Sequence, residues 1–263
     1  MAEARKWRSW AKRLTWASVV LSIGAVVAAL IAAVGSGQEW WHFRSGFFVL
    51  RIAFYAAAAG GVIALAAMYV ARRAEPKLVF VNLFALVVAL AFLLYLGNLV
   101  RTARSVVPLH DITTNLDDYP RFYRLTVRDD NLANLPTQGR RELEALEPRE
   151  RWKAIHREAY PDLRTIRVPW NEAETVRRAE ALARERGWEI VTVDLEEGVV
   201  EAVDTSRFFR FKDNVIVRVR PVSEGNGSMV DMRSMSRVGT SDLGVNARRI
   251  RSFLADLQAQ AGG

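Results

Sequence analysis

The chain has 263 residues, 51% of them hydrophobic and 25% charged, with a formal net charge of +8. Residues 1–104 carry 12 Lys and Arg against 3 Asp and Glu, a net +9, whereas residues 105–263 carry 25 against 26, a net −1. The basic excess therefore accompanies apolar segments, where it sets membrane topology, and gives no reason to expect nucleic-acid binding. Cysteine is absent, which excludes disulfides and thiolate metal sites.

Three apolar segments, about 14–34, 47–70 and 78–100, predict three transmembrane helices in a region spanning residues 1–104. The first has 21 residues without a charge, enough to cross a hydrocarbon core of about 30 Å. A signal peptide is the alternative for it, but the run is longer than a signal core and two further spans follow. Gly60-Gly61 predicts close helix packing in the second span. Asn82, near one end of the third, is expected to meet water or headgroups.

The loop charges predict the orientation. The N-terminal leader holds five Lys and Arg and the loop 71–77 holds three, whereas the loop 35–46 holds only Arg44. Because positively charged loops stay in the cytoplasm, the N-terminus is expected inside and residues 105–263 outside. Aromatic residues at both ends fit membrane interfaces: Trp40, Trp41 and Phe43 outside, and Trp7, Trp10 and Trp16 inside.

Residues 105–263 predict a soluble α+β domain. Residues 105–128, with two prolines, read as irregular, and residues 143–160 as helical, with Pro148 interrupting that helix or beginning its second part. A helix from the N-cap Asn171 to Arg186 and a last helix opening at Ser241 flank a run of strands. The expected strands cover residues 165–168, 188–194, 199–205, 214–220 and 229–238. Short turns between them predict an antiparallel sheet of about four to five strands covered by helices.

Two patterns in these strands indicate which residues are expected to face solvent. Residues 214–220 alternate valine with arginine, which predicts one wet face. Four carboxylates gather around a predicted hairpin, Asp194, Glu196, Glu197 and Glu201. Paired carboxylates can do acid–base chemistry, but we interpret these as solvating a turn and an exposed strand face.

No catalytic signature is present: there is no His-Glu-x-x-His, no Gly-x-Ser-x-Gly and no Gly-rich phosphate loop with lysine. The spacing of the three histidines predicts neither a metal site nor a cofactor. The strongest polar cluster consists of Arg233, Arg237, Asp242, Asn246 and Arg249, expected where the last strand turns into the last helix. It reads either as a structural clasp, with Asp231 pairing the arginines and Ser241 capping the helix, or as a site for a carboxylate or phosphate.

A second candidate cluster is His110 and Asp111, just after the third span. Adjacent residues do not face one another automatically, so the simpler interpretation is hydrogen bonding within a turn.

Several motifs carry a resemblance to a known family. They are His110 to Thr114, Ala159 to Leu163, Gly187-Trp188, Phe211 to Val215, Asp231 to Gly244, Asn246 and Arg249. In this order they resemble the domain of unknown function 1499 family, found in bacteria and plastids, over roughly residues 105–258. The resemblance implies no activity. Together with the spans it predicts a bacterial cytoplasmic (inner) membrane protein with a periplasmic domain.

Two functions remain open for residues 105–263. One is a non-enzymatic domain that binds a ligand, a lipid or an envelope partner protein, with an anionic small molecule as one such ligand. The alternative is a membrane-anchored hydrolase of an envelope substrate that uses Asp231, Asp242 or His110. A transporter is disfavoured, because the three spans carry no charge away from their ends. The expected partners include the lipid bilayer and exclude nucleic acid.

Overall fold

The computed structural model describes residues 2–133, 135–223 and 225–261, in two compact units. One comprises Met1–Thr102 together with Arg207–Arg210, and the other Ala103–Ser206 together with Phe211–Gly263.

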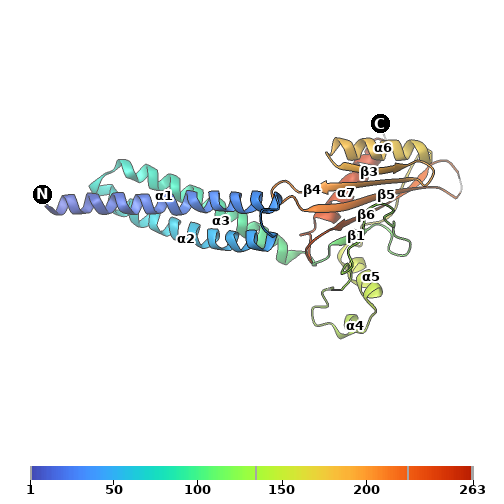
Figure 1. Ribbon diagram of the computed structural model, residues 1–263, viewed down its shortest axis with the longest axis horizontal. Helices are drawn as coiled ribbons and strands as arrows, with labels where there is room; N and C mark the ends of the chain where they lie inside the picture. Colours follow the sequence, from blue (N-terminus) through green and yellow to red (C-terminus); the bar gives the residue numbers. More distant parts are fainter. Residues whose placement is uncertain (1, 134, 224, 262–263) are drawn as a thin grey trace. The chain divides into compact units, whose positions relative to one another are not determined.

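The first unit consists of α1 (Ala2–Gly37), α2 (Phe43–Ala74) and α3 (Lys77–Ser105), as Figure 1 shows. By length and composition, all three are able to cross a membrane. This confirms the three apolar helices expected from the sequence. Each extends beyond its apolar segment, because the polar residues at the ends continue the helix.

Small residues bring α1 and α2 together. The buried stripe of α2 includes Ala53, Ala57, Gly60, Ala64, Ala67 and Ala71. A Cβ on Gly60 would lie 2.6 Å from Oγ and 2.9 Å from the backbone nitrogen of Ser22. The close approach expected at Gly60 is therefore real, since a larger residue there would push the helices apart.

The environment of Asn82 is not the water or headgroups that were expected. Its side chain is 0% exposed. It accepts a hydrogen bond from Ser18 Oγ at 2.7 Å and donates one to Thr15 Oγ1 at 2.8 Å. A polar group in an apolar environment needs such partners, so Asn82 ties α3 to α1.

The second unit is an α+β domain with a six-stranded antiparallel sheet in the order β1-β6-β5-β4-β3, with β2 also paired to β6. This confirms the expected fold class. The additional strand is β1, within the segment expected to be irregular. The elements are β1 (Asp111–Thr113), α4 (Arg141–Glu144), α5 (Pro148–Ala159), β2 (Ile166–Val168), α6 (Glu172–Glu185), β3 (Glu189–Asp194), β4 (Val199–Thr205), β5 (Lys212–Pro221), β6 (Ser228–Ser236) and α7 (Val245–Ala259).

The helix boundaries follow local chemistry. The Asn171 side chain accepts from the backbone N–H of Glu174 at 2.9 Å, as expected of an N-cap. Pro148 is the first residue of α5. The last helix does not open at Ser241 but at Val245, after Gly244, whose φ is +74°. The cap is supplied by Asp242, whose carboxylate accepts from the N–H groups of Gly244 and Asn246 at 2.8 and 2.6 Å.

Helices α6 and α7 cover one face of the sheet (Figure 1) and share its apolar core, which includes Val215, Val217, Val230 and Met232. The opposite face is covered too, by the segment that follows β1. There Glu201 is 0% exposed and accepts from the backbone N–H groups of Tyr123, Arg124 and Leu125. The expected solvation of Glu201 was therefore wrong, because a loop supplies the cover. The expected wet face of β5 is only partly exposed, since the side chain of Arg218 is 14% exposed and that of Arg220 is 41% exposed. Asp194 does bond the turn, accepting from Glu196 and Glu197.

Candidate functional site

The five residues of the main predicted cluster do not all converge. Successive side chains of a strand point to opposite faces. On β6, Ser234 therefore faces α7, with Asn246 and Arg249, whereas Arg233 lies on the other face. Arg237 lies just after β6, is exposed, and donates from Nε to Asn214 Oδ1 at 2.7 Å.

Arg249 is the centre of a clasp between α7 and the sheet. Its Nη2 lies 2.7 Å from Oδ2 of both Asp204 and Asp213, and its Nε lies 2.9 Å from Asp204 Oδ2. Its Nη1 donates to Ser234 Oγ at 2.8 Å and to Asn246 Oδ1. The side chain is only 6% exposed and uses all three guanidinium nitrogens. This arrangement favours the structural interpretation over an anion site at Arg249.

Asp242 stabilises the same junction as the cap of α7. Burial raises the pKa of its carboxyl group above the usual value, and the hydrogen bonds from Asn246 and Gly244 oppose that rise. Asn246 joins the cap to the sheet, because its Nδ2 donates to the His110 carbonyl and to Ser236 Oγ, both at 3.0 Å.

The clasp interpretation supposed that Asp231 neutralises Arg233 and Arg237, but Asp231 pairs with other residues. Its Oδ2 lies 2.8 Å from Arg218 and 2.6 Å from Arg220, and its Oδ1 accepts from Thr165 at 2.5 Å. Cross-strand pairing decides this, since Asp231 lies directly opposite Arg218.

Arg233 instead pairs with Asp111 of the second predicted cluster. Nε and Nη2 of Arg233 lie 2.9 and 2.7 Å from the two carboxylate oxygens, and both side chains are buried. Burial alone would raise the pKa of Asp111, but Arg233 outweighs it and holds the pKa below the usual value. The two candidate clusters therefore meet through these residues.

His110 joins the pair indirectly. Asn131 donates from Nδ2 to Asp111 Oδ2 at 2.6 Å, which leaves its Oδ1 to face His110 Nε2 at 3.1 Å. His110 Nε2 therefore carries the proton and donates to Asn131. His110 and Asp111 are thus bridged by a third residue that the sequence had not singled out.

Aromatic rings hold the Arg233 guanidinium in place. It lies 4.7 Å from the ring centroid of Tyr119 and 5.3 Å from that of Phe122, and its Nη1 donates to the Pro120 carbonyl at 3.2 Å. Trp152 of α5 donates from Nε1 to the Asp111 carbonyl at 2.9 Å. The ion pair is thereby fixed from both α5 and the covering segment.

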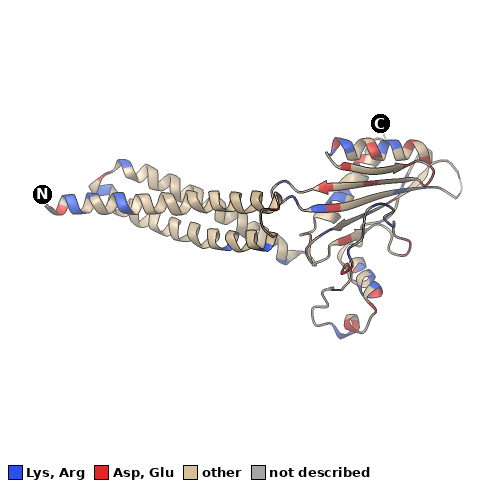
Figure 2. Cartoon of the chain, in the orientation of Figure 1, with Lys and Arg blue, Asp and Glu red and all other residues tan. Residues whose placement is uncertain are grey.

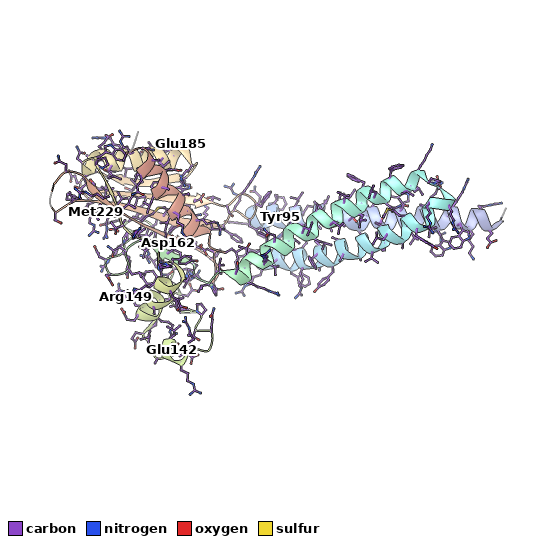
Figure 3. The ribbon with its side chains drawn as sticks, turned by 180° about the vertical axis from the view of Figure 1, so that it is seen from behind. Tyr95, Glu142, Arg149, Asp162, Glu185 and Met229 are labelled. Atoms are coloured by element: carbon purple, nitrogen blue, oxygen red, sulfur yellow. The ribbon has the colours of Figure 1, made fainter. Side chains whose placement is uncertain are left out.

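A cavity of about 570 Å³ lies against this ion pair. Tyr119, Phe122 and Trp152 give it aromatic walls, and its lining holds four arginines against two aspartates. Of those arginines, Arg121 and Arg149 have no carboxylate partner among the residues that the structure describes. Arg149, on α5 (Figure 3), donates to the Tyr119 hydroxyl and lies 5.1 Å from its ring centroid.

A second cavity, of about 370 Å³, is lined by His156, Arg157, Tyr160 and Arg164. His156 is 1% exposed, and its Nε2 accepts from the Thr113 N–H at 3.1 Å. The proton therefore resides on Nδ1, which has no partner within the described chain, and the Tyr160 hydroxyl has none either. Burial lowers the pKa of His156 to about 4, so the ring is neutral near pH 7.

A sequence model of the family described as protein of unknown function (DUF1499) matches residues 111–257, more than half of the chain. The chain belongs to this family. This confirms the resemblance drawn from the motifs, and the match leaves α1, α2 and α3 outside the DUF1499 domain. It runs from β1 into α7, so the domain contains both the Asp111–Arg233 pair and the Arg249 clasp. No curated protein matches the chain.

Proposed function

We propose that this integral membrane protein presents a DUF1499 domain that binds an anionic ligand with an aromatic or apolar part. The observation that carries the proposal is the cavity beside the Asp111–Arg233 pair, where Arg121 and Arg149 stand without carboxylate partners next to aromatic walls. Its volume suits a small molecule, and its lining combines aromatic side chains with charged groups that are able to orient a ligand.

The arginines that line this cavity have different roles, and this difference supports the proposal. Arg233 is neutralised by Asp111 and serves to position the wall. Arg149 is held by the ring and hydroxyl of Tyr119, which leaves its charge uncompensated. A phosphate or carboxylate is the natural partner for such a guanidinium, because it accepts charge-assisted hydrogen bonds.

Titration of the full-length protein in phosphatidylcholine nanodiscs with 1-naphthyl phosphate tests the proposal. Arg149→Ala and Arg121→Ala should each weaken binding by about tenfold to a hundredfold, the effect of losing a charged hydrogen bond. Arg157→Ala is the matched control, since Arg157 lies on the same helix but lines the other cavity. Inorganic phosphate lacks the aromatic ring and 1-naphthol lacks the phosphate, so each should bind less tightly than 1-naphthyl phosphate. Equal affinity for all variants would overturn the proposal.

A hydrolase is the second candidate, and His156 favours it, because a neutral imidazole beside a cavity is able to act as a general base. However, its Nε2 lone pair is occupied by the Thr113 N–H and its Nδ1 carries the proton. Asp231 is engaged by two arginines and Asp242 by the helix cap. These contacts favour binding. Release of 1-naphthol from the same probe, abolished by His156→Gln, would favour the hydrolase instead.

We further propose that the N-terminus is cytoplasmic and that the DUF1499 domain lies outside, in the bacterial periplasm. The support is the charge of the short loops: Figure 2 shows Lys and Arg gathered where α1 begins and where α2 gives way to α3. A reporter active only in the cytoplasm, fused after Gly263, should stay silent. Strong reporter activity would contradict this orientation.

A further inference from the structure

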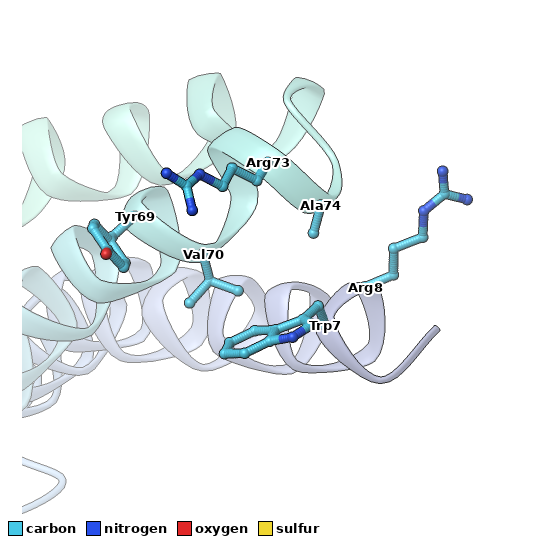
Figure 4. A pocket seen from close by; sticks show the side chains of 6 residues that line it. All are labelled: Trp7, Arg8, Tyr69, Val70, Arg73 and Ala74. Carbon is cyan, nitrogen blue, oxygen red and sulfur yellow. The ribbon is translucent and has the colours of Figure 1, made fainter. Parts of the chain in front are cut away.

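We infer that a cavity between the start of α1 and the end of α2 binds the phosphate headgroup of an anionic phospholipid. The cavity has a volume of about 450 Å³. Trp7 and Arg8 line it from α1, and Tyr69, Val70, Arg73 and Ala74 line it from α2 (Figure 4). Since both helices are candidate spans and this is where they begin and end, the cavity lies at headgroup depth.

The charge at this cavity suits an anion. Arg8 and Arg73 come from facing helices, and neither has a carboxylate partner in the described part of the chain. Glu75, the acidic residue closest to Arg73 in sequence, is paired with Lys12 at 3.6 Å. The guanidinium groups of Arg8 and Arg73 point in opposite directions (Figure 4), so two positive charges flank the cavity and attract an anion to it.

The aromatic residues place this charge at an interface. Trp7 and Tyr69 are 53% and 65% exposed, and Arg72 lies 4.1 Å from the ring centroid of Tyr69. Tryptophan and tyrosine beside basic residues are typical of the boundary between headgroups and acyl chains.

A neighbouring cavity favours a lipid over a soluble anion. It has a volume of about 340 Å³ and shares Trp7 and Val70 with the first. Trp10 and Leu14 extend its apolar wall, and Glu3 and Lys6 line its other part with one charge of each sign. A phospholipid has a phosphate for the arginines and an acyl chain for this apolar wall, whereas a soluble phosphate would use only the first cavity. The inference does not depend on the ligand site of the DUF1499 domain, and the orientation decides only which leaflet supplies the lipid.

Native mass spectrometry of the full-length protein tests the inference. The protein, released from detergent, is offered equal amounts of phosphatidylglycerol and phosphatidylcholine. The double variant Arg8→Gln/Arg73→Gln should lose about thirtyfold in phosphatidylglycerol retention, as expected for two basic residues near an anionic headgroup. The double variant Arg101→Gln/Arg104→Gln removes the same charge from α3 and is the matched control.

The wild type and the control should retain phosphatidylglycerol in preference to phosphatidylcholine. An equal loss in both double variants would overturn the inference, because the effect would then reflect net charge. Absence of a preference between the two lipids would overturn it as well. Displacement of the lipid by an equal concentration of glycerol 3-phosphate would assign the site to soluble phosphates and also overturn it.

Discussion

Replacing Arg233 by alanine should lower the free energy of unfolding by about 3–5 kcal/mol, the usual effect of removing one partner from a buried ion pair. The loss would leave the carboxylate of Asp111 buried with Asn131 as its remaining side-chain partner. It would also remove the guanidinium from between Tyr119 and Phe122. Urea denaturation of the full-length protein in mild detergent, followed by tryptophan fluorescence, measures the change.

Arg237→Ala provides the matched control for this experiment. Arg237 is exposed and its described side-chain contact is the single hydrogen bond to Asn214, so its removal should cost no more than about 1 kcal/mol. Losses of equal size at Arg233 and Arg237 would show that the Asp111–Arg233 pair does not stabilise the domain in the way that the structure indicates.

Lowering the pH from about 7 to about 4 should remove about 3 kcal/mol of stability through His156. In the unfolded chain this pKa is near 6.5, and in the fold burial lowers it to about 4. The fold therefore prefers the neutral ring. Its stabilising contribution is fully present above about pH 6.5 and is lost as the pH falls toward the folded value.

Neighbouring carboxylates do not produce the same signal. The fold lowers the pKa values of Asp111 and Asp162. The stability that these two carboxylates contribute is therefore lost only when the pH falls below their usual pKa, near 3.8. Asp242, with a raised pKa, gains stability as the pH falls, which has the opposite sign. His156→Gln keeps an acceptor for the Thr113 N–H and removes the titration. Unfolding measured between about pH 7 and about pH 4 should be flatter for this variant, and an unchanged pH dependence would exclude His156 as the cause.

The sequence predicted the helices and strands better than it predicted which of them, and which side chains, contact one another. Apolar length predicted three helices, and alternation with short turns predicted the antiparallel sheet. It did not predict β1, because three residues are too few for a pattern and pairing with β6 selects the strand. Glu201 was misinterpreted for a related reason: its cover comes from backbone N–H groups of a loop, which leave no periodic signal.

The candidate site could be predicted residue by residue but not as an assembly. Asp111 and Arg233 were each singled out, in separate clusters, although they form one ion pair across 122 residues. Asn131, Asp204 and Asp213 were missed, since single polar residues carry no sign of the distant arginine or carboxylate that they contact. Arg121 and Arg149 were not singled out either, because only the fold places them beside aromatic rings.

Photolabelling with an azido derivative of 1-naphthyl phosphate tests most directly whether the DUF1499 domain binds its ligand beside the Asp111–Arg233 pair. The full-length protein in phosphatidylcholine nanodiscs is irradiated with the probe, digested and analysed by mass spectrometry. Label should appear on Tyr119 to Phe122 and on Trp152, the aromatic walls of the cavity, and excess 1-naphthyl phosphate should suppress it. Label on residues 156–165, which belong to the other cavity, or label that the competitor fails to suppress, would contradict the account.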